Sequence, residues 1–239
     1  MSQRSLLCLI HGHGVDASIW GSVYADLALD HQVLTPDFSR LTHLTTIEAY
    51  ADALYDQLAL ADGQKVILAG HSMGGYIALA FAEKHPDRVQ GLVLYHSTAV
   101  ADDEAKRQAR QQVIQELRTS GTQPFIHKQM PKMVAPSYAP ERIEALEDRF
   151  RNLPAEALIA GIKAIANRPD RTAVIRDARF PVLLILGRDD QLIPYEKTAQ
   201  LADLSSRIKL VTIEQAGHLS MVEQPAQSTA VLRDFGGQF

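Results

Sequence analysis

Residues 66–84 read VILAGHSMGGYIALAFAEK, and this stretch decides the fold of the chain. Its first four residues are apolar and β-prone, which is typical of a strand buried on both faces of a sheet. The pattern from Tyr76 to Lys84 is helical. Glycines flank Ser72 in the turn between them, because side chains on so tight a bend would collide with neighbouring backbone. We therefore expect the Ser72 hydroxyl to be pushed outward at the start of a helix.

Similar apolar runs occur on both sides of this stretch, and helical patterns separate several of them. The predicted strands are Leu6–Ile10, Gln32–Thr35, Val66–Ala69, Gly91–Tyr95, Val182–Leu186 and Ile208–Ile213. From Ile47 to Leu58 the apolar residues recur at helical spacing, and Thr45 and Glu48 are spaced as a capping box. This alternation favours an α/β fold with a parallel sheet and helices on both faces. Ligands bind such a sheet beyond the carboxyl ends of its strands.

The alternation breaks between Thr98 and about Asp177, where no convincing strand occurs. We interpret residues 98–177 as an inserted helical lid, or cap, and residues 1–97 and 178–239 as the core. Glycines and prolines punctuate the insertion and separate its helical patterns. The predicted lid helices are Asp102–Ser120, Gln123–Met130, Pro140–Asn152 and Pro154–Asn167.

Composition narrows the class of protein. Hydrophobic residues make up 46% and charged residues 22% of the 239 residues, a balance that allows a substantial core. The net charge of -4 comes from scattered residues, so nucleic acid is not an expected partner. No apolar run approaches the roughly 20 residues that span a bilayer, and neither a membrane partner nor a signal peptide is expected. Cys8 is the only cysteine, which excludes an intrachain disulfide. We expect a cytoplasmic protein with a small-molecule substrate; the sequence does not specify its oligomeric state.

Gly70, Ser72 and Gly74, placed after a strand and before a helix, resemble the GxSxG turn of the α/β-hydrolase family. The alternative is a glycine-rich turn with an incidental serine. The resemblance extends over nearly the whole chain, because further motifs follow in the family order of serine, acid and histidine. It implies an α/β-hydrolase fold with a mostly parallel sheet of about six strands and a helical lid. Two strands that many relatives carry have no counterpart before Leu6.

The acid is expected after the predicted strand Val182–Leu186, where residues 187–194 read GRDDQLIP. The family spacing between the glycine, the acid and the proline selects Asp190. Asp189 or another acid is the alternative, and either aspartate could instead be a solvated turn residue. As the acid, Asp190 would accept a hydrogen bond from the histidine ring and stabilise the imidazolium that forms.

The base is expected after the predicted strand Ile208–Ile213. Gly217 and His218, with Glu223 and Pro225 beyond them, resemble the histidine loop of the family. An imidazole can take the serine proton and return it to the leaving group near neutral pH. The resemblance thus implies that His218 is the base, and the alternative is a histidine of a surface loop.

The oxyanion that forms when a serine attacks a carbonyl needs hydrogen-bond donors held in place beforehand. Met73 follows the serine, and the geometry of the GxSxG turn, the nucleophile elbow, directs its backbone N–H into the site. Residues 11–14 read HGHG and resemble the oxyanion loop of the family, in which the backbone N–H of His13 is the matching donor. The alternative is a glycine-rich connection without that role.

Candidate substrate contacts come from the start of the lid and from its helices. His96 follows a predicted strand and should lie near the pocket mouth, where it either contacts substrate or begins the lid. Phe125, Met130 and Met133 suggest an apolar pocket of modest size. Their alternative role is to anchor the lid on the core.

Together these residues imply nucleophilic catalysis, in which Ser72 attacks, an acyl-enzyme forms and water activated by His218 releases the acid. The expected function is a carboxylesterase-like hydrolase of a small, apolar carboxylic ester or related acyl compound. Neither a metal nor an organic cofactor is expected. The same triad could serve a lyase, a carbon–carbon hydrolase or a cofactor-free perhydrolase. Outside enzymes, the alternative is a ligand receptor or signalling protein without turnover.

Overall fold

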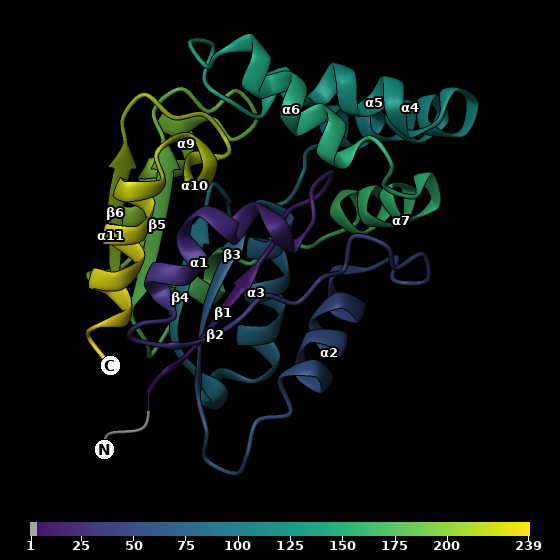
Figure 1. Ribbon diagram of the computed structural model, residues 1–239. Helices are drawn as coiled ribbons and strands as arrows, with labels where there is room; N and C mark the ends of the chain where they lie inside the picture. The colour runs from purple at the N-terminus through teal and green to yellow at the C-terminus, as the bar shows by residue number, and fades with distance from the viewer. Residues whose placement is uncertain (1–3) are drawn as a thin grey trace.

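Six parallel strands form one sheet in the order β2-β1-β3-β4-β5-β6 (Figure 1). The computed structural model describes residues 4–239. The strands are β1 (Leu6–Ile10), β2 (Gln32–Leu34), β3 (Val66–His71), β4 (Val89–Tyr95), β5 (Val182–Gly187) and β6 (Ile208–Ile213). The predicted fold class is therefore confirmed, and every predicted strand is present to within two residues at either end.

The sheet is covered on both faces because successive strand residues point to opposite sides. On one face Cys8 and Leu68 pack against α2 (Ile47–Leu58) and α3 (Met73–Lys84). On the other face their neighbours, such as Leu7, pack with α1 (Gly21–Leu27) and α11 (Pro225–Gly236). These two layers explain why every residue of β1, β3 and β5 is buried.

Between β4 and β5 the chain forms helices and no strand, which agrees with the helical insertion expected there; the lid boundaries remain a prediction. The helices are α4 (Glu104–Ser120), α5 (Thr122–Gln129), α6 (Pro140–Phe150), α7 (Ala155–Ala166) and α8 (Thr172–Arg176). Helices α4 to α7 gather at one end of the molecule, and α4 packs against α7 (Figure 1). The short helix α8 instead contacts α3 of the core.

The remaining elements are short and lie mainly in the connections. They are α9 (Tyr195–Ala199), α10 (Ser220–Glu223) and the 3-10 helices η1 (Ala17–Trp20), η2 (Pro86–Arg88), η3 (Met130–Lys132) and η4 (Gln200–Leu204). Within residues 4–239, no helix is long and apolar enough to cross a membrane.

The predicted capping box of α2, from Thr45 and Glu48, does not form. Thr46, not Thr45, is the N-cap, and its hydroxyl accepts from the Ala49 N–H at 3.1 Å. The Glu48 carboxylate instead accepts from Arg171 at 2.6 Å, because this arginine, at the start of α8, reaches α2. Two adjacent threonines offer the same cap, and the sequence alone did not distinguish them.

Candidate active site

Ser72 lies in a strained turn between β3 and α3, with φ 52° and ψ -116°. The turn is crowded, since a Cβ at Gly70 would lie 2.2 Å from the Gly74 carbonyl oxygen. A Cβ at Gly74 would lie 2.3 Å from the carbonyl oxygen of Ile10 in β1. Only glycine fits at these two positions, and a non-glycine residue at positive φ is costly unless its surroundings enforce it. The packing of β1, β3 and α3 thus holds Ser72 in this conformation.

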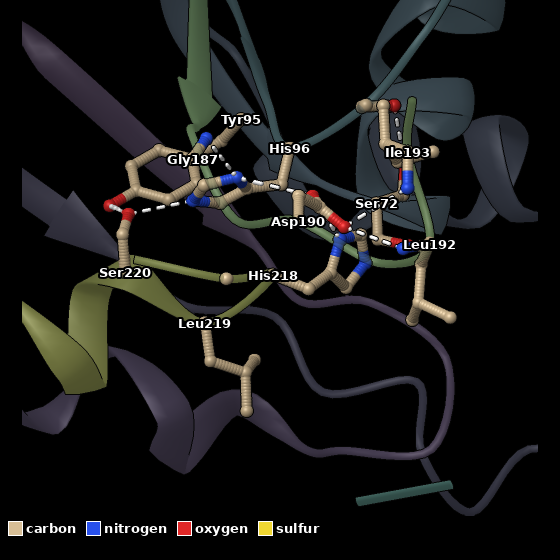
Figure 2. Close-up of polar contacts among 12 residues, drawn as sticks. Ser72, Tyr95, His96, Gly187, Asp190, Leu192, Ile193, His218, Leu219 and Ser220 are labelled. Atoms are coloured by element: carbon tan, nitrogen blue, oxygen red, sulfur yellow. Dashed lines mark hydrogen bonds and ion pairs between the residues drawn. The ribbon is translucent and has the colours of Figure 1, made fainter. Parts of the chain in front are cut away.

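His218 and Asp190 form a buried pair at the carboxyl ends of β6 and β5 (Figure 2). His218 Nδ1 lies 2.8 Å from Asp190 Oδ2, and both side chains are 1% exposed. The other carboxylate oxygen accepts from the N–H groups of Leu192 at 2.8 Å and Ile193 at 3.0 Å. Burial opposes ionisation of Asp190, but the charge and hydrogen bond of His218 outweigh it and hold the pKa of Asp190 below its usual range.

An ionised Asp190 only accepts hydrogen bonds, so Nδ1 of His218 is the donor and Nε2 is left free to act as a base. His218 and Ser72 line the same cavity, of about 150 Å³. Asp189 is exposed, and only its backbone N–H is engaged, with the Ala216 carbonyl oxygen at 3.0 Å. The geometry therefore brings together Ser72, His218 and Asp190 and leaves Asp189 outside.

His96 does not line this cavity, which corrects its expected place at the pocket mouth. Its ring is fully buried behind Asp190, with Nδ1 3.5 Å from Asp190 Oδ2. The Gly187 N–H donates to Nδ1 at 3.0 Å, so Nε2 carries the proton and donates to the Ser220 hydroxyl at 2.7 Å (Figure 2). Burial lowers the pKa of His96, in keeping with a neutral ring. Sequence reasoning missed this position because it predicts where a strand ends but not which way the next side chain turns.

Further hydrogen bonds lead from His96 through Ser220 and Tyr95 to Ser228, and each group donates to the next. The Ser220 and Tyr95 hydroxyls form a hydrogen bond of 2.7 Å. The Tyr95 hydroxyl in turn donates to the Ser228 hydroxyl at 2.7 Å. Ser228 then donates to the Ser220 carbonyl oxygen at 2.9 Å. These bonds join β4, the last residue of β5, α10 and α11. They hold in place the segments next to Asp190 and His218.

His71, just before Ser72, supports the main chain of His218. Its Nε2–H donates to the His218 carbonyl oxygen at 2.9 Å, and the two ring centroids are 4.8 Å apart. Burial lowers the pKa of His71 well below its ordinary value, and the nearby His218 and His96 add to this effect. A neutral His71 therefore ties the elbow to the histidine loop, a role that no sequence signal indicated.

Glu223 organises the loop around His218. Its carboxylate accepts from the Gly217 N–H at 3.0 Å and from the Leu219 N–H at 3.1 Å. It also accepts from the N–H of Ala135, in the insertion, at 2.7 Å. One buried carboxylate thus fixes both sides of His218 and joins that loop to the insertion.

The two expected oxyanion donors lie at the carboxyl ends of β1 and β3. Met73 is the first residue of α3, where backbone N–H groups have no partner within the helix. The His13 N–H bonds no protein acceptor among residues 4–239. The His13 ring turns to the insertion and its Nε2–H donates to the Leu158 carbonyl oxygen of α7 at 2.9 Å. Burial lowers the pKa of the ring to about 4, so it is neutral near pH 7.

The insertion contributes a mixed wall to the cavity. Met133, one of the expected substrate contacts, lines it together with Gln129 of α5 and Arg110 of α4. Met130 and Phe125 do not line the cavity, which corrects their expected role: Met130 is fully buried in the core, and Phe125 packs edge-on against His13 with ring centroids 5.9 Å apart. The register of α5 and η3 decides this, because it turns Met130 inward and leaves Gln129 facing the site.

Comparisons with known proteins agree with this architecture. The profile of the Alpha/beta hydrolase family matches residues 7–231. A solved thermophilic esterase from Thermogutta terrifontis, with malate bound, is 30% identical, with 97% of this chain and 89% of that chain covered and a TM-score of 0.89. A pimeloyl-[acyl-carrier protein] methyl ester esterase from Klebsiella pneumoniae is 30% identical, over 92% of this chain and 89% of the relative.

A 2-hydroxymuconate semialdehyde hydrolase from a Pseudomonas strain is 27% identical, over 96% of this chain and 86% of the relative. The family profile and these matches confirm the predicted resemblance and support the predicted enzyme class, a hydrolase that acts on ester bonds. The strand-turn-helix around Ser72, the parallel sheet and the family profile lead to one conclusion: the chain belongs to the alpha/beta hydrolase family.

Proposed function

We propose that the chain is a serine hydrolase that cleaves a small carboxylic ester through an acyl-enzyme. Ser72 is the nucleophile, His218 is the general base and Asp190 orients the imidazole. The observation that carries the proposal is the 2.8 Å bond from His218 Nδ1 to Asp190, in a cavity that His218 shares with Ser72. That bond leaves Nε2 unprotonated, so it can accept a proton first from Ser72 and later from the attacking water.

The reaction has two halves. Ser72 Oγ attacks the ester carbonyl carbon as its proton passes to His218 Nε2, and the tetrahedral oxyanion is bound by the N–H groups of His13 and Met73. The C–O bond to the alcohol then breaks, and His218 returns its proton to the leaving oxygen. Water next attacks the acyl carbonyl and gives a proton to His218. Collapse of the second intermediate releases the carboxylic acid and restores the Ser72 hydroxyl.

A fluorophosphonate probe, which reacts with activated serines, tests the nucleophile and the base. The wild type should be labelled, whereas Ser72→Ala and His218→Ala should not be. Circular dichroism spectra of both variants should match the wild type, so that lost labelling reports chemistry rather than unfolding. Labelling that persists in a folded Ser72→Ala variant would refute the proposal.

The two adjacent aspartates provide a matched test of the acid. Asp190→Asn should lower kcat for p-nitrophenyl esters by about 10⁴, because the amide stabilises the wrong imidazole tautomer. Asp189→Asn removes the same charge one residue away and should change kcat by less than about threefold, because its carboxylate faces solvent. The opposite ranking would reassign the acid.

A panel of short and long p-nitrophenyl esters, thioesters and lactones defines the bond that is cleaved. Peroxide-dependent acyl transfer and carbon–carbon cleavage are measured beside it, because the same triad can support both. Malate is bound in the Thermogutta terrifontis esterase, so small dicarboxylic acids belong among the first inhibitors to be tested on this chain.

A further inference from the structure

Arg110 of α4 brings a positive charge to the cavity that contains Ser72 and His218. The same residue lines a second hollow of about 480 Å³, the outer hollow. Tyr76, Gln129 and Leu192 also line both hollows, so the two are adjacent and Arg110 stands between them. A ligand that spans the two hollows therefore lies beside this guanidinium.

The charge of Arg110 is only partly balanced within the fold. Its Nε donates to Asp102, whose other oxygen accepts from Arg168 at 2.9 Å. Burial opposes ionisation of Asp102, but the hydrogen bonds from Arg110 and Arg168 outweigh it and hold the pKa of Asp102 below its usual range. Two guanidinium groups therefore share one buried carboxylate, which leaves one positive charge in excess.

The excess resides on Arg110 rather than on Arg168. Arg168 is 4% exposed, donates to the carbonyl oxygens of Ile165 and Val100, and stacks 4.1 Å from the centroid of the Tyr76 ring. Arg110 is 30% exposed, and among residues 4–239 its side chain has no hydrogen bond other than the one from Nε. Both Nη groups of Arg110 thus remain available to a ligand.

The outer hollow has the same sign of charge. Lys106 of α4 and Lys197 of α9 line it together with Arg110 and Arg168, whereas its acidic residues are Asp102 and Asp103. The cationic residues exceed the acidic ones, although the chain as a whole has a net charge of -4. A cleft with an excess of one charge attracts ligands of the opposite charge.

We propose that Arg110 binds a carboxylate of the substrate, so that the enzyme takes an ester that carries a free carboxylate. This inference rests on the proposed function and names its substrate class. A guanidinium with two free Nη groups matches the two oxygens of a carboxylate, and such charge-assisted pairs are strong. Gln129 adds an amide beside Arg110, while Met133 and Ile165 provide an apolar wall for a short carbon chain. A half-ester of a short dicarboxylic acid, or an ester whose alcohol part bears the carboxylate, fits these features.

Two pairs of esters test the proposal, each with one anionic and one neutral member. Mono-p-nitrophenyl glutarate and p-nitrophenyl pentanoate differ in the acyl part, and 4-acetoxybenzoate and 4-methylphenyl acetate differ in the alcohol part. The wild type should prefer the anionic member of at least one pair by about tenfold or more in kcat/KM. Arg110→Gln should lower kcat/KM for that anionic ester by about 10- to 100-fold, mostly through KM, and leave the neutral member within about threefold.

Control variants separate binding from a structural role of Arg110, which also pairs with Asp102. Arg118→Gln removes the same charge from an exposed position on α4 and should leave the preference intact. Arg110→Lys keeps the charge but loses the two-pronged geometry and should recover part of the preference. Equal losses for anionic and neutral esters in Arg110→Gln would show that Arg110 acts only through the fold, and would overturn the proposal.

Binding of glutarate separates failure of this proposal from failure of the proposed function. NMR titration of the wild type and of Arg110→Gln with glutarate needs no turnover. If no ester is cleaved but glutarate binds only with Arg110 present, the ester-hydrolase function fails and the anion site stands. If neutral esters are cleaved but the wild type neither prefers an anionic ester nor binds glutarate, the function stands and the carboxylate site is refuted.

Discussion

Glu223→Gln isolates the contribution of one buried carboxylate to the loop of the base. Oε2 of Glu223 accepts from Ala135 and Gly217, and Oε1 accepts from Gly217 and Leu219. Glutamine has nearly the same shape but only one oxygen, so it can serve one of these two sets. If the glutamine oxygen takes the place of Oε2, its NH₂ group faces the Leu219 N–H; if it takes the place of Oε1, the NH₂ group faces the Ala135 N–H.

The cost follows from these contacts. One charge-assisted hydrogen bond is lost and a buried N–H is left without an acceptor, which together cost about 3 kcal/mol. The remaining bonds also weaken, because a neutral amide replaces the carboxylate. For a chain of this length, about 3 kcal/mol corresponds to a fall in Tm of roughly 6 to 12 °C. Since Gly217 and Leu219 flank His218, kcat for ester turnover should fall as well.

Glu214→Gln is the matched control, because it makes the same change on an exposed residue of the neighbouring turn. Glu214 pairs with Arg188 at 3.2 Å and is 61% exposed. A surface pair of this kind contributes about 0 to 1 kcal/mol. In urea and thermal unfolding at neutral pH, Glu223→Gln should therefore have a clearly lower free energy of unfolding and Tm than Glu214→Gln. Equal Tm values for the two variants would refute the reasoning.

Three further changes test other contacts of the site. A Cβ at Gly161 of α7 would lie 2.7 Å from the His13 ring, so Gly161→Ala should destabilise the fold by about 1 to 3 kcal/mol in urea unfolding. A Cβ at Gly21 would meet nothing within 4 Å, so Gly21→Ala should instead stabilise the fold by about 0.4 to 1 kcal/mol. If both variants changed the free energy of unfolding in the same direction, this reasoning would be wrong. The pKa of His13 lies at about 4 in the folded chain against 6.5 ordinarily, so its contribution to stability is complete above pH 6.5 and is lost as the pH falls toward 4. Urea titrations should show the wild type losing about 2 kcal/mol more than His13→Asn from about pH 7 to about pH 5, and parallel curves would refute this. His96→Ala should lower kcat for p-nitrophenyl esters with little change in KM, because the Gly187 N–H, at the end of β5 before the turn of Asp190, loses its acceptor. An effect on KM alone would indicate substrate contact.

The sheet was predictable because burial on both faces leaves a simple mark on the sequence. Leu6–Ile10 is a continuous apolar run, and in Ile208–Ile213 only Lys209 interrupts the apolar and β-branched residues. The predicted and observed ends of both strands coincide. Finer choices were not predictable. Thr45 and Thr46 are chemically equivalent caps, and the choice between them depends on how the chain enters α2.

The candidate site divides along the same line. Ser72, Asp190 and His218 could be grouped from the sequence because each follows a predicted strand within a recognisable motif, and parallel strands bring such positions to one edge. Their catalytic roles remain a prediction. No comparable motif shows which side chains of the insertion face the cavity. Met130 is buried instead, and nothing in the sequence separates Arg110 from the other polar residues of its amphipathic helix. The pairing of Arg110 and Arg168 with one carboxylate appears only when α4 and the segment after α7 are seen together.

Strands β4 and β5 are neighbours in the sheet although α4 to α8 separate them along the chain. A nascent polypeptide that has emerged only as far as the insertion contains Ser72 but neither Asp190 nor His218. Until β5 arrives, the apolar β4 has an open hydrogen-bonding edge, which is prone to pair with other chains. Closing the sheet across so long a loop is a slow, non-local event. Maturation of the enzyme should therefore be limited by docking of roughly its last quarter, from β5 onward. Chaperones that shield β4 should raise the yield of active protein.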